Sequence, residues 1–421
     1  EIGKDYYKEI DSNIFDFLEG YEEIYRIKLY PVKMLKKKKN TGSLDKIEEV
    51  AVFRADEGGD FSRFSIKTFF AIAITGYFLD NGMHQPILAP IVNRHKAEGL
   101  KYVEYRYSFG SSIFDEWHTR FGNFLKESST DDFIAKAVIR LYDDTTYYDK
   151  LRDFLARNPD LVDTIVGVDF SGREVAPKKR EKFFKKLDRD NRENPAQALD
   201  AVVHVGENFF DKSIESAIRW CHQYAELGAA RLGHCIALGL DPEVAISRRP
   251  DAHLKEAIAE RLDQISYDLK YQDQLQEYGI DINREALLKE KDELVDRDPE
   301  GKVCREYNDN RLQDIRKRQN FVLDRLKELG TVIETCPTSN LRIGGIPELK
   351  YHPFKKFYDS GVNLVICSDD PGVFDMPLAD EVDLIQEGFG IDPKELYQRL
   401  GDPYDYRLGK TREMAQDSKL S

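Results

Sequence analysis

Short apolar runs alternate with helical patterns along most of the chain. Each run is rich in Val, Ile, Leu and Tyr and ends abruptly at polar residues, which is typical of a strand buried in a parallel sheet. The helical stretches between the runs have the length of crossover connections, so the pattern predicts an α/β fold with helices covering the sheet. Seven strands are predicted, at 101–108, 136–144, 164–172, 201–208, 230–238, 331–340 and 361–371.

The number and spacing of these strands favour a (β/α)8 TIM barrel. A length of 421 residues suits such a barrel with insertions. A closed barrel needs eight strands, so one strand is not accounted for. We expect an N-terminal helical region over 1–100 with the first barrel strand upstream or degenerate, a first barrel part over 101–247, a helical insertion over 248–330, and the remaining barrel with terminal helices over 331–421.

The predicted helical segments lie before and between the strands. Residues 65–79 and 87–99 are helical in pattern. Within 248–330 two apolar faces recur at helical spacing, which predicts a long antiparallel helical insertion. Its role is open between a packing or oligomerisation arm and a lid over the active site. The two faces consist of Leu254, Ile258, Leu262, Ile265 and Leu269, and of Leu312, Ile315, Val322 and Leu326.

Composition narrows the class of protein. With 41% hydrophobic and 33% charged residues the chain is an ordinary globular protein, and a net charge of −14 argues against duplex nucleic acid as a partner. Five cysteines without a CxxC spacing predict reduced thiols. No apolar run reaches the ~18 residues of a membrane span. We therefore expect a cytoplasmic protein with no membrane partner.

Polar side chains gather where the predicted strands end. In a parallel barrel these ends converge on one rim, where chemistry collects. Singly, a strand-end histidine is usually structural and adjacent acids usually cap a helix. Together they offer ligands for a cation and further groups for proton transfer, which favours an active site. The residues are Asp169, His204, Glu207, His234, Asp369 and Asp370.

At these residues the sequence resembles the adenosine and AMP deaminases, the metal-dependent purine deaminases of the amidohydrolase superfamily. "HVGE" (204–207) resembles the family's HAGE, and "RLGHC" (231–235) its RxGHG. "CPTSN" (336–340) resembles CPxSN, "SDDP" (368–371) resembles [ST]DDP, and "VDFSG" (168–172) resembles a D-x-x-G stretch. The family resemblance runs from about residue 100 to 390, outside the insertion.

The resemblance implies a zinc-dependent deamination of the purine 6-amino group. A bound Zn²⁺ lowers the pKa of its water toward ~7, and the hydroxide attacks C6 with loss of ammonia. The implied roles are zinc binding for His204 and Asp369, orientation and deprotonation of the water for His234, protonation of N1 for Glu207, a hydrogen bond to N7 for Asp370, a backbone N–H to N3 for Gly172, and substrate binding for Asp169.

One part of the family pattern is missing. The family takes two further zinc ligands from an H-x-H at the end of its first strand, and the chain has no H-x-H. Either that strand lies upstream of Glu1, so that 14–25 resembles a helical stretch that follows it, or "FDFLEG" (15–20) is a decayed HxHLEG. We favour the first, because a dead site has little reason to keep Glu207, His234 and Asp370 together.

The basic segment 173–192 bears on the substrate, because it holds nine Lys or Arg residues after the strand of Asp169. It is either the solvated face of a helix packed through Phe183, Phe184 and Leu187, or a rim loop whose cations bind phosphate. "SFGSSIFDEW" (108–117) resembles the AMP-specific branch. Some deaminase-like proteins of bacterial anti-phage defence have large helical insertions and convert ATP to ITP. Adenosine, AMP and ATP all stay open as substrates. The candidate phosphate ligands are Lys178, Lys179, Arg180, Lys185 and Lys186.

Two other functions are compatible with the sequence. The first is a catalytically inactive deaminase-like barrel that serves as an assembly scaffold, and the second is a different amidohydrolase reaction. In each case, we expect a homo-oligomer formed through the 248–330 insertion.

Overall fold

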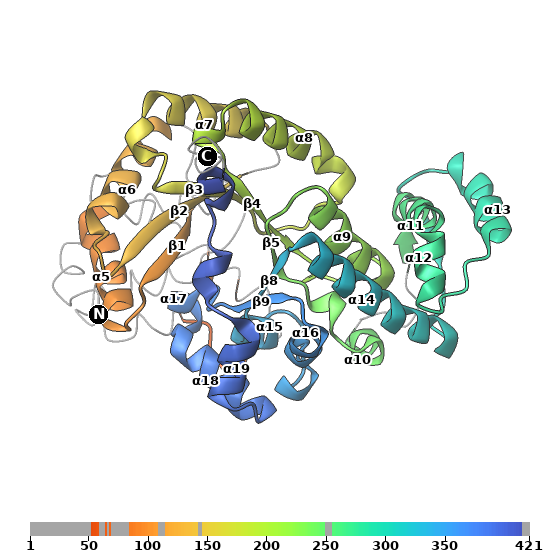
Figure 1. Cartoon of the computed structure of the whole chain (residues 1–421). Helices are drawn as coiled ribbons and strands as arrows, with labels where there is room; N and C mark the ends of the chain where they lie inside the picture. Colours follow the sequence, from red (N-terminus) through yellow and green to blue (C-terminus); the bar gives the residue numbers. More distant parts are fainter. Residues whose placement is uncertain are drawn as a thin grey trace, which may run out of the picture. The chain divides into compact units, whose positions relative to one another are not determined.

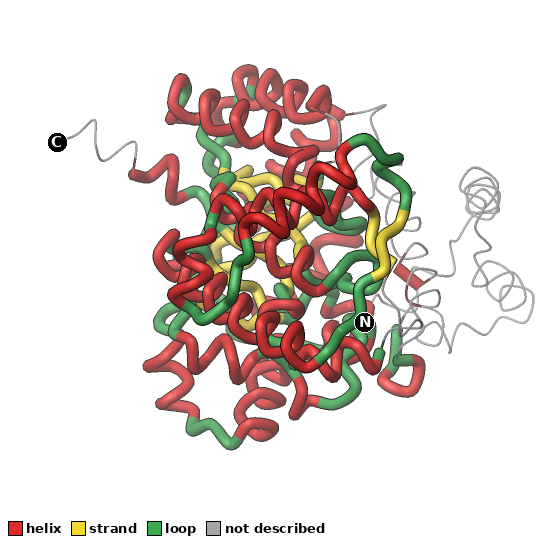
Figure 2. The backbone as a smooth tube through the Cα atoms, turned by 90° about the vertical axis from the view of Figure 1, so that its right-hand side faces the viewer, coloured by secondary structure: helices red, strands yellow, loops and turns green. Residues whose placement is uncertain are grey.

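The computed structural model describes residues 52–58, 64, 67–68, 84–107, 114–141, 145–248 and 255–414, which are drawn in colour in Figures 1 and 2. Contacts within the chain divide it into two compact units. The first contains the described residues up to Arg140, with Tyr148–Val166 and Asp369–Pro377. The second contains Leu141–Tyr147, Gly167–Ser368 and the residues from Leu378 onward.

All seven predicted strands are present, and they form one parallel sheet in the order β1-β2-β3-β4-β5-β8-β9. The α/β prediction is therefore confirmed. An eighth strand of this sheet does not occur among the described residues. The bounds are β1 (Tyr102–Tyr107), β2 (Ile134–Arg140), β3 (Ile165–Phe170), β4 (Asp200–Val205), β5 (Arg231–His234), β8 (Val332–Thr335) and β9 (Asn363–Ile366).

In the first unit, helices pack on the β1–β2 pair. Helix α6 (Phe114–Ser128) is amphipathic and buries Trp117, Phe121 and Phe124. Helix α5 (His84–Ala97) confirms the helix predicted over 87–99, and its His95 Nδ1 lies 2.8 Å from the Tyr105 hydroxyl. Of the helix predicted over 65–79, the described Lys67 and Thr68 are helical, and the remainder lies outside the described residues.

The strands of the seven-stranded sheet lie inside a layer of helices (Figure 2). Helices α9 and α14 run side by side along this layer (Figure 1). Ser213 caps α9 by accepting a hydrogen bond from the Ser216 N–H, and α14 ends at Gly330, whose φ of 72° favours glycine. The second unit contributes the helices α8 (Pro177–Glu193), α9 (Ile214–Glu226), α10 (Pro242–Ser247), α14 (Asp309–Leu329), α15 (Pro337–Arg342), α16 (Phe354–Ser360), α18 (Leu378–Phe389) and α19 (Pro393–Leu400).

The segment between β5 and α14 forms a separate helical group beside α14 (Figure 1). An antiparallel pair of short strands brings its two ends together, because Lys255 pairs with Cys304. Buried Ile258, Ile265 and Leu294 hold the group together. Its elements are β6 (Lys255–Ala257), α11 (Ile258–Lys270), α12 (Gln272–Glu277), α13 (Arg284–Val295) and β7 (Lys302–Cys304).

The helical character predicted over 248–330 is confirmed for the described residues, although Leu254 lies outside them. The apolar face of α14 is buried as predicted at Leu312, Ile315, Val322 and Leu326. Because α14 packs along α9 and leads into β8, it belongs to the helix layer of the sheet. The domain limits and an oligomer through this region stay predictions.

All five cysteines fall within the described ranges and are free thiols. Within those ranges no helix is both long enough and apolar enough to cross a bilayer.

Candidate active site

The end of β4 presents a histidine and a glutamate on either side of a tight turn. His204 is the fifth residue of the strand, and Gly206 follows with a φ of 71°. A Cβ at position 206 would lie 2.8 Å from the Cys221 sulfur, so both the backbone conformation and the space require glycine. This turn places Glu207 just beyond the strand end.

The end of β5 is built to receive the His204 ring. In the sheet register His204 lies opposite Gly233, and a Cβ on Gly233 would approach His204 Cδ2 to 2.9 Å. His234 and Cys235 then have positive φ values of 68° and 50°. Two consecutive non-glycine residues in this region are energetically costly, and such strain is concentrated at functional sites.

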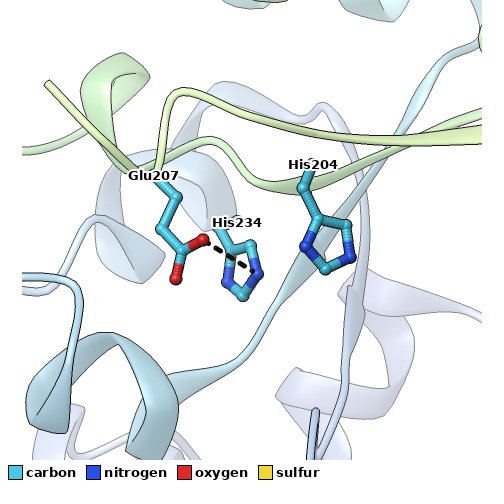
Figure 3. A group of neighbouring side chains, drawn as sticks. All are labelled: His204, Glu207 and His234. Atoms are coloured by element: carbon cyan, nitrogen blue, oxygen red, sulfur yellow. Dashed lines mark ion pairs between the residues drawn. The ribbon is translucent and has the colours of Figure 1, made fainter. Parts of the chain in front are cut away.

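These two strand ends bring His204, Glu207 and His234 together, as Figure 3 shows. One ligand atom from each lies within 4.8 Å of the others. The imidazole rings of His204 and His234 are 4.9 Å apart at an interplanar angle of 80°. His234 Nε2 is 3.6 Å from Glu207 Oε2. The structure thus brings these three predicted site residues together, and their roles stay predictions.

Burial within the group is graded. The side chain of His234 is 2% exposed, that of His204 is 12% exposed, and that of Glu207 is 22% exposed. Asp169, at the end of β3, is fully buried, and its Oδ1 lies 3.8 Å from His204 Nε2. The imidazole and carboxylate groups match the donor set that Zn²⁺ prefers, and Glu207 is the member most open to a small molecule.

A buried ion pair that sequence reasoning missed holds the loop carrying Glu207. Glu174 Oε1 accepts hydrogen bonds from the backbone N–H groups of Glu207 (2.8 Å) and Asn208 (2.7 Å). Lys212 lies 3.4 Å from Glu174 Oε2 and donates to the Asn208 carbonyl at 2.7 Å. Its ammonium group also lies 4.5 Å from the Trp220 ring centre.

These contacts clamp both ends of the loop after β4. The available sequence signal was weak, because Glu174 lies beyond Ser171, Gly172 and Arg173, after the end of β3 at Phe170. Its partner Lys212 is 38 residues away in sequence, and local sequence patterns do not connect residues so far apart.

Of the two alternatives for 173–192, the helix is correct for most of the segment and the rim loop is wrong there, because residues 177–193 form helix α8. Phe183, Phe184 and Leu187 are buried, as the helix-face interpretation predicted. Arg180 is buried against the Phe170 ring at 4.2 Å. Lys185 and Lys186 pair with Glu181 and Asp190 of the same helix. Phosphate binding by these cations receives no support from this geometry.

The remaining predicted residues are placed as follows. Gly172 follows β3 with a φ of 86°. Asp369 follows β9 with a φ of 55°, and Asp370 precedes α17 (Pro371–Phe374), accepting hydrogen bonds from Val373 and Phe374 through its carbonyl. Asp369 and Asp370 belong to the first unit, and their joint action with His204 stays a prediction. The segments 14–25 and 108–113 lie outside the described residues.

Comparison with known proteins finds similarity to purine deaminases. Residues 309–400 match the family model "Adenosine deaminase". The adenine deaminase of Rhizobium leguminosarum bv. trifolii (strain WSM2304) is 41% identical over 75 residues, which are 18% of this chain and 23% of that protein. The chain thus matches about a quarter of the length of this curated relative. The family match contains CPTSN and SDDP, whereas His204, Glu207 and His234 precede it.

Solved structures of the same fold extend over nearly the whole chain. The Arabidopsis N6-mAMP deaminase MAPDA is 15% identical with a TM-score of 0.52, and the match covers 96% of this chain and 92% of that one. Arabidopsis ADAL complexed with IMP is also 15% identical with a TM-score of 0.52, covering 97% and 92%. The fold is the TIM-barrel type of these deaminases. The sequence likeness to the adenosine deaminases extends over residues 309–400, and the likeness to the solved structures shows the fold.

Proposed function

We propose that this protein is a metal-dependent hydrolase that removes the 6-amino group of an adenine nucleoside or nucleotide, releasing ammonia. The observation that carries this proposal is the convergence of His204, Glu207 and His234 at two neighbouring strand ends, with ligand atoms within 4.8 Å of one another. Two imidazoles and a carboxylate gathered at the ends of parallel strands, where barrel enzymes carry their catalytic residues, fit a hydrolytic site better than a purely structural role.

The donor set around His204 fits a zinc ion, with Asp369 as the proposed partner ligand. Zn²⁺, when bound, lowers the pKa of a water molecule toward ~7 and so makes hydroxide available at neutral pH. His234 holds the attacking water in place through its ring. Glu207 delivers a proton to N1 of the purine, and this makes C6 more electrophilic. The role suits the Glu207 side chain, because it is more exposed than those of His204 and His234.

The purine itself is held by three further residues. Asp370 forms a hydrogen bond with N7, and the Gly172 N–H forms one with N3. Asp169 is the third residue that we assign to substrate binding. A purine ligand agrees with the names of the similar proteins, which include an adenine deaminase, an N6-mAMP deaminase and a complex with IMP. We propose an adenine nucleoside or nucleotide as substrate, with adenosine, AMP and ATP as the compounds to compare.

The test combines metal analysis with ultraviolet monitoring of adenosine, AMP and ATP. We expect bound zinc and loss of the adenine spectrum for at least one of the three. Glu207→Gln should keep the metal and lower kcat by about 10²- to 10⁴-fold, the usual contribution of a general acid. Unchanged activity in this variant would rule out the acid role, and zinc without any spectral change would favour another hydrolase reaction.

A further inference from the structure

Behind His234 lies a chain of buried hydrogen bonds that leads away from the site. His234 Nδ1 is 2.9 Å from the side-chain nitrogen of Asn340, which lies on α15. The side-chain oxygen of Asn340 is 3.1 Å from His352 Nε2. His352 Nδ1 accepts a hydrogen bond from the backbone N–H of Phe354 at 3.1 Å. His234, Asn340 and His352 are at most 3% exposed.

The hydrogen bond from the Phe354 N–H fixes which atom donates and which accepts in every hydrogen bond of this series. A backbone N–H can only donate, so His352 Nδ1 must carry a lone pair. His352 is therefore neutral with its proton on Nε2. Burial, reinforced by the neighbouring His234, lowers the pKa of His352 to about 3, which agrees with a neutral ring. The Nε2–H group of His352 then donates to the oxygen of Asn340.

The orientation of the Asn340 amide follows from this donor. Its oxygen faces His352, so its NH₂ group faces His234 and donates to Nδ1. The flipped amide would set two donors against each other inside a buried cluster, where an unmet hydrogen bond costs about 1–3 kcal/mol. Nδ1 of His234 is thus an acceptor, and the proton of the neutral ring lies on Nε2.

We infer that Asn340 and His352 are positioning residues that hold His234 in the Nε2–H tautomer. In this tautomer the nitrogen nearest Glu207, at 3.6 Å, is a hydrogen-bond donor (Figure 3). His234 then holds an oxygen atom of the reactants by donating to it, and this neutral ring has no acceptor on Nε2 with which to deprotonate water. The assignment deepens the proposed function, because it changes the role of His234 from a base to a donor.

The primary test is ¹⁵N NMR of the full chain labelled at histidine, with the His234 signals assigned by their loss in His234→Gln. We expect a pyridine-type Nδ1 and a protonated, pyrrole-type Nε2. Asn340→Asp replaces the donating amide by an acceptor of nearly the same shape, so a proton should appear on Nδ1 of His234. A protonated Nδ1 in the wild type, or an unchanged spectrum in Asn340→Asp, would overturn the inference.

Asn320→Asp is the matched control, because it makes the same chemical change at an exposed position of α14. It should leave the His234 signals unchanged. The NMR result does not depend on turnover, so it separates failure of this inference from failure of the proposed function. Absence of deamination in the wild type with the expected tautomer would reject the function alone.

The kinetic test asks whether the loss of activity appears in kcat or in KM. Asn340→Asp should lower kcat by about 10- to 100-fold, the usual cost of losing a residue that orients a site histidine, with KM within about twofold. His352→Leu removes the donor to Asn340 and should act in the same direction. His352→Gln keeps a donor and should recover part of the loss. A rise in KM alone, or equal defects in the Leu and Gln variants, would contradict a positioning role.

Discussion

Two buried polar clusters of the second unit differ in how their charges are matched. Between the helices, each carboxylate of the cluster faces an arginine. Glu215 of α9 receives two hydrogen bonds from Arg311 of α14, at 2.7 and 3.1 Å. Asp268 of α11 receives two from Arg318, at 2.6 and 2.9 Å. At the strand ends, by contrast, Glu207 faces an imidazole at 3.6 Å.

The pKa of Glu215 follows from this matching. Burial raises the pKa of Glu215, but the charges of Arg311 and Arg305 outweigh it and lower the pKa to about 2. A carboxylate matched in this way stays ionised and holds helices together. A carboxylate beside an imidazole, with 22% of its side chain exposed, is suited to exchange a proton. Matching of charge therefore separates the structural acids of this fold from the acid proposed for chemistry.

The largest effect on stability is expected at the matched pair. Glu215→Leu leaves the Arg311 guanidinium buried without its carboxylate, which should lower the free energy of unfolding by about 3–5 kcal/mol. Urea denaturation measures this change. The double variant Glu215→Leu/Arg311→Met should recover part of the loss, because no uncompensated charge remains. A loss below about 1 kcal/mol in the single variant would show that the pair is not a structural contact.

The clamp on the Glu207 loop should affect activity more than stability. Lys212→Met keeps an apolar stem near Trp220 and removes the ammonium group that holds Glu174 and the Asn208 carbonyl. We expect kcat to fall by about tenfold with unchanged metal content, as is usual when a supporting contact of a site is lost. Lys178→Met, at an exposed lysine of α8, is the control. Wild-type kcat in Lys212→Met would show that the loop needs no clamp.

The stability of the fold at acidic pH should depend on a third kind of buried group, the histidines. Burial lowers the pKa of His222 to about 4, with Glu226 opposing the shift. Because the unfolded chain binds this proton below about pH 6.5, stability should fall as pH drops from 6.5 toward 4, by at most about 1.4 kcal/mol per unit for each such histidine.

The stability that Glu215 provides is lost only as pH falls from about 4.5 through 2, since its pKa is lowered. Urea denaturation at several pH values distinguishes the two ranges. His222→Gln should flatten the slope between pH 6.5 and 4.5. An unchanged slope would mean that His222 protonates without cost in the folded protein.

The smallest effect is expected on the surface of α8. Lys185 pairs with Glu181 of the same helix, and its side chain is 72% exposed. Lys185→Ala should change the free energy of unfolding by less than about 1 kcal/mol. It should also leave the KM for AMP and ATP unchanged. A marked rise in KM for the nucleotides but not for adenosine would restore phosphate binding by this helix.

The sequence was informative where a pattern is local. The seven strands were predicted because buried parallel strands are short apolar runs, and His204, Glu207 and His234 were found because each follows such a run. For segment 173–192 a helix face and a rim loop both stayed open, because the spacing of Phe183 and Leu187 favours a packed helix whereas the cluster of Lys and Arg residues also fits a phosphate-binding loop. The pair β6–β7 was missed because "KEA" and "KVC" carry no strand pattern.

Contacts between distant residues account for the rest. Glu174 with Lys212, and Asn340 with His234, join positions 38 and 106 residues apart. No spacing rule connects such pairs, because they meet only after the sheet has formed. The glycine at 233 carried a readable signal that was not used, since a strand interior without a side chain indicates close approach of another group.

Because Lys255 pairs with Cys304, the helices between them form an excursion whose two ends lie side by side. The span between β5 and β8 is bridged by α14, so it does not depend on how long the excursion is. Evolution or an engineer can therefore change the length of this excursion at the modest entropic cost of a closed loop, provided that the contacts of α11 with the helix layer, such as Asp268 with Arg318, are kept.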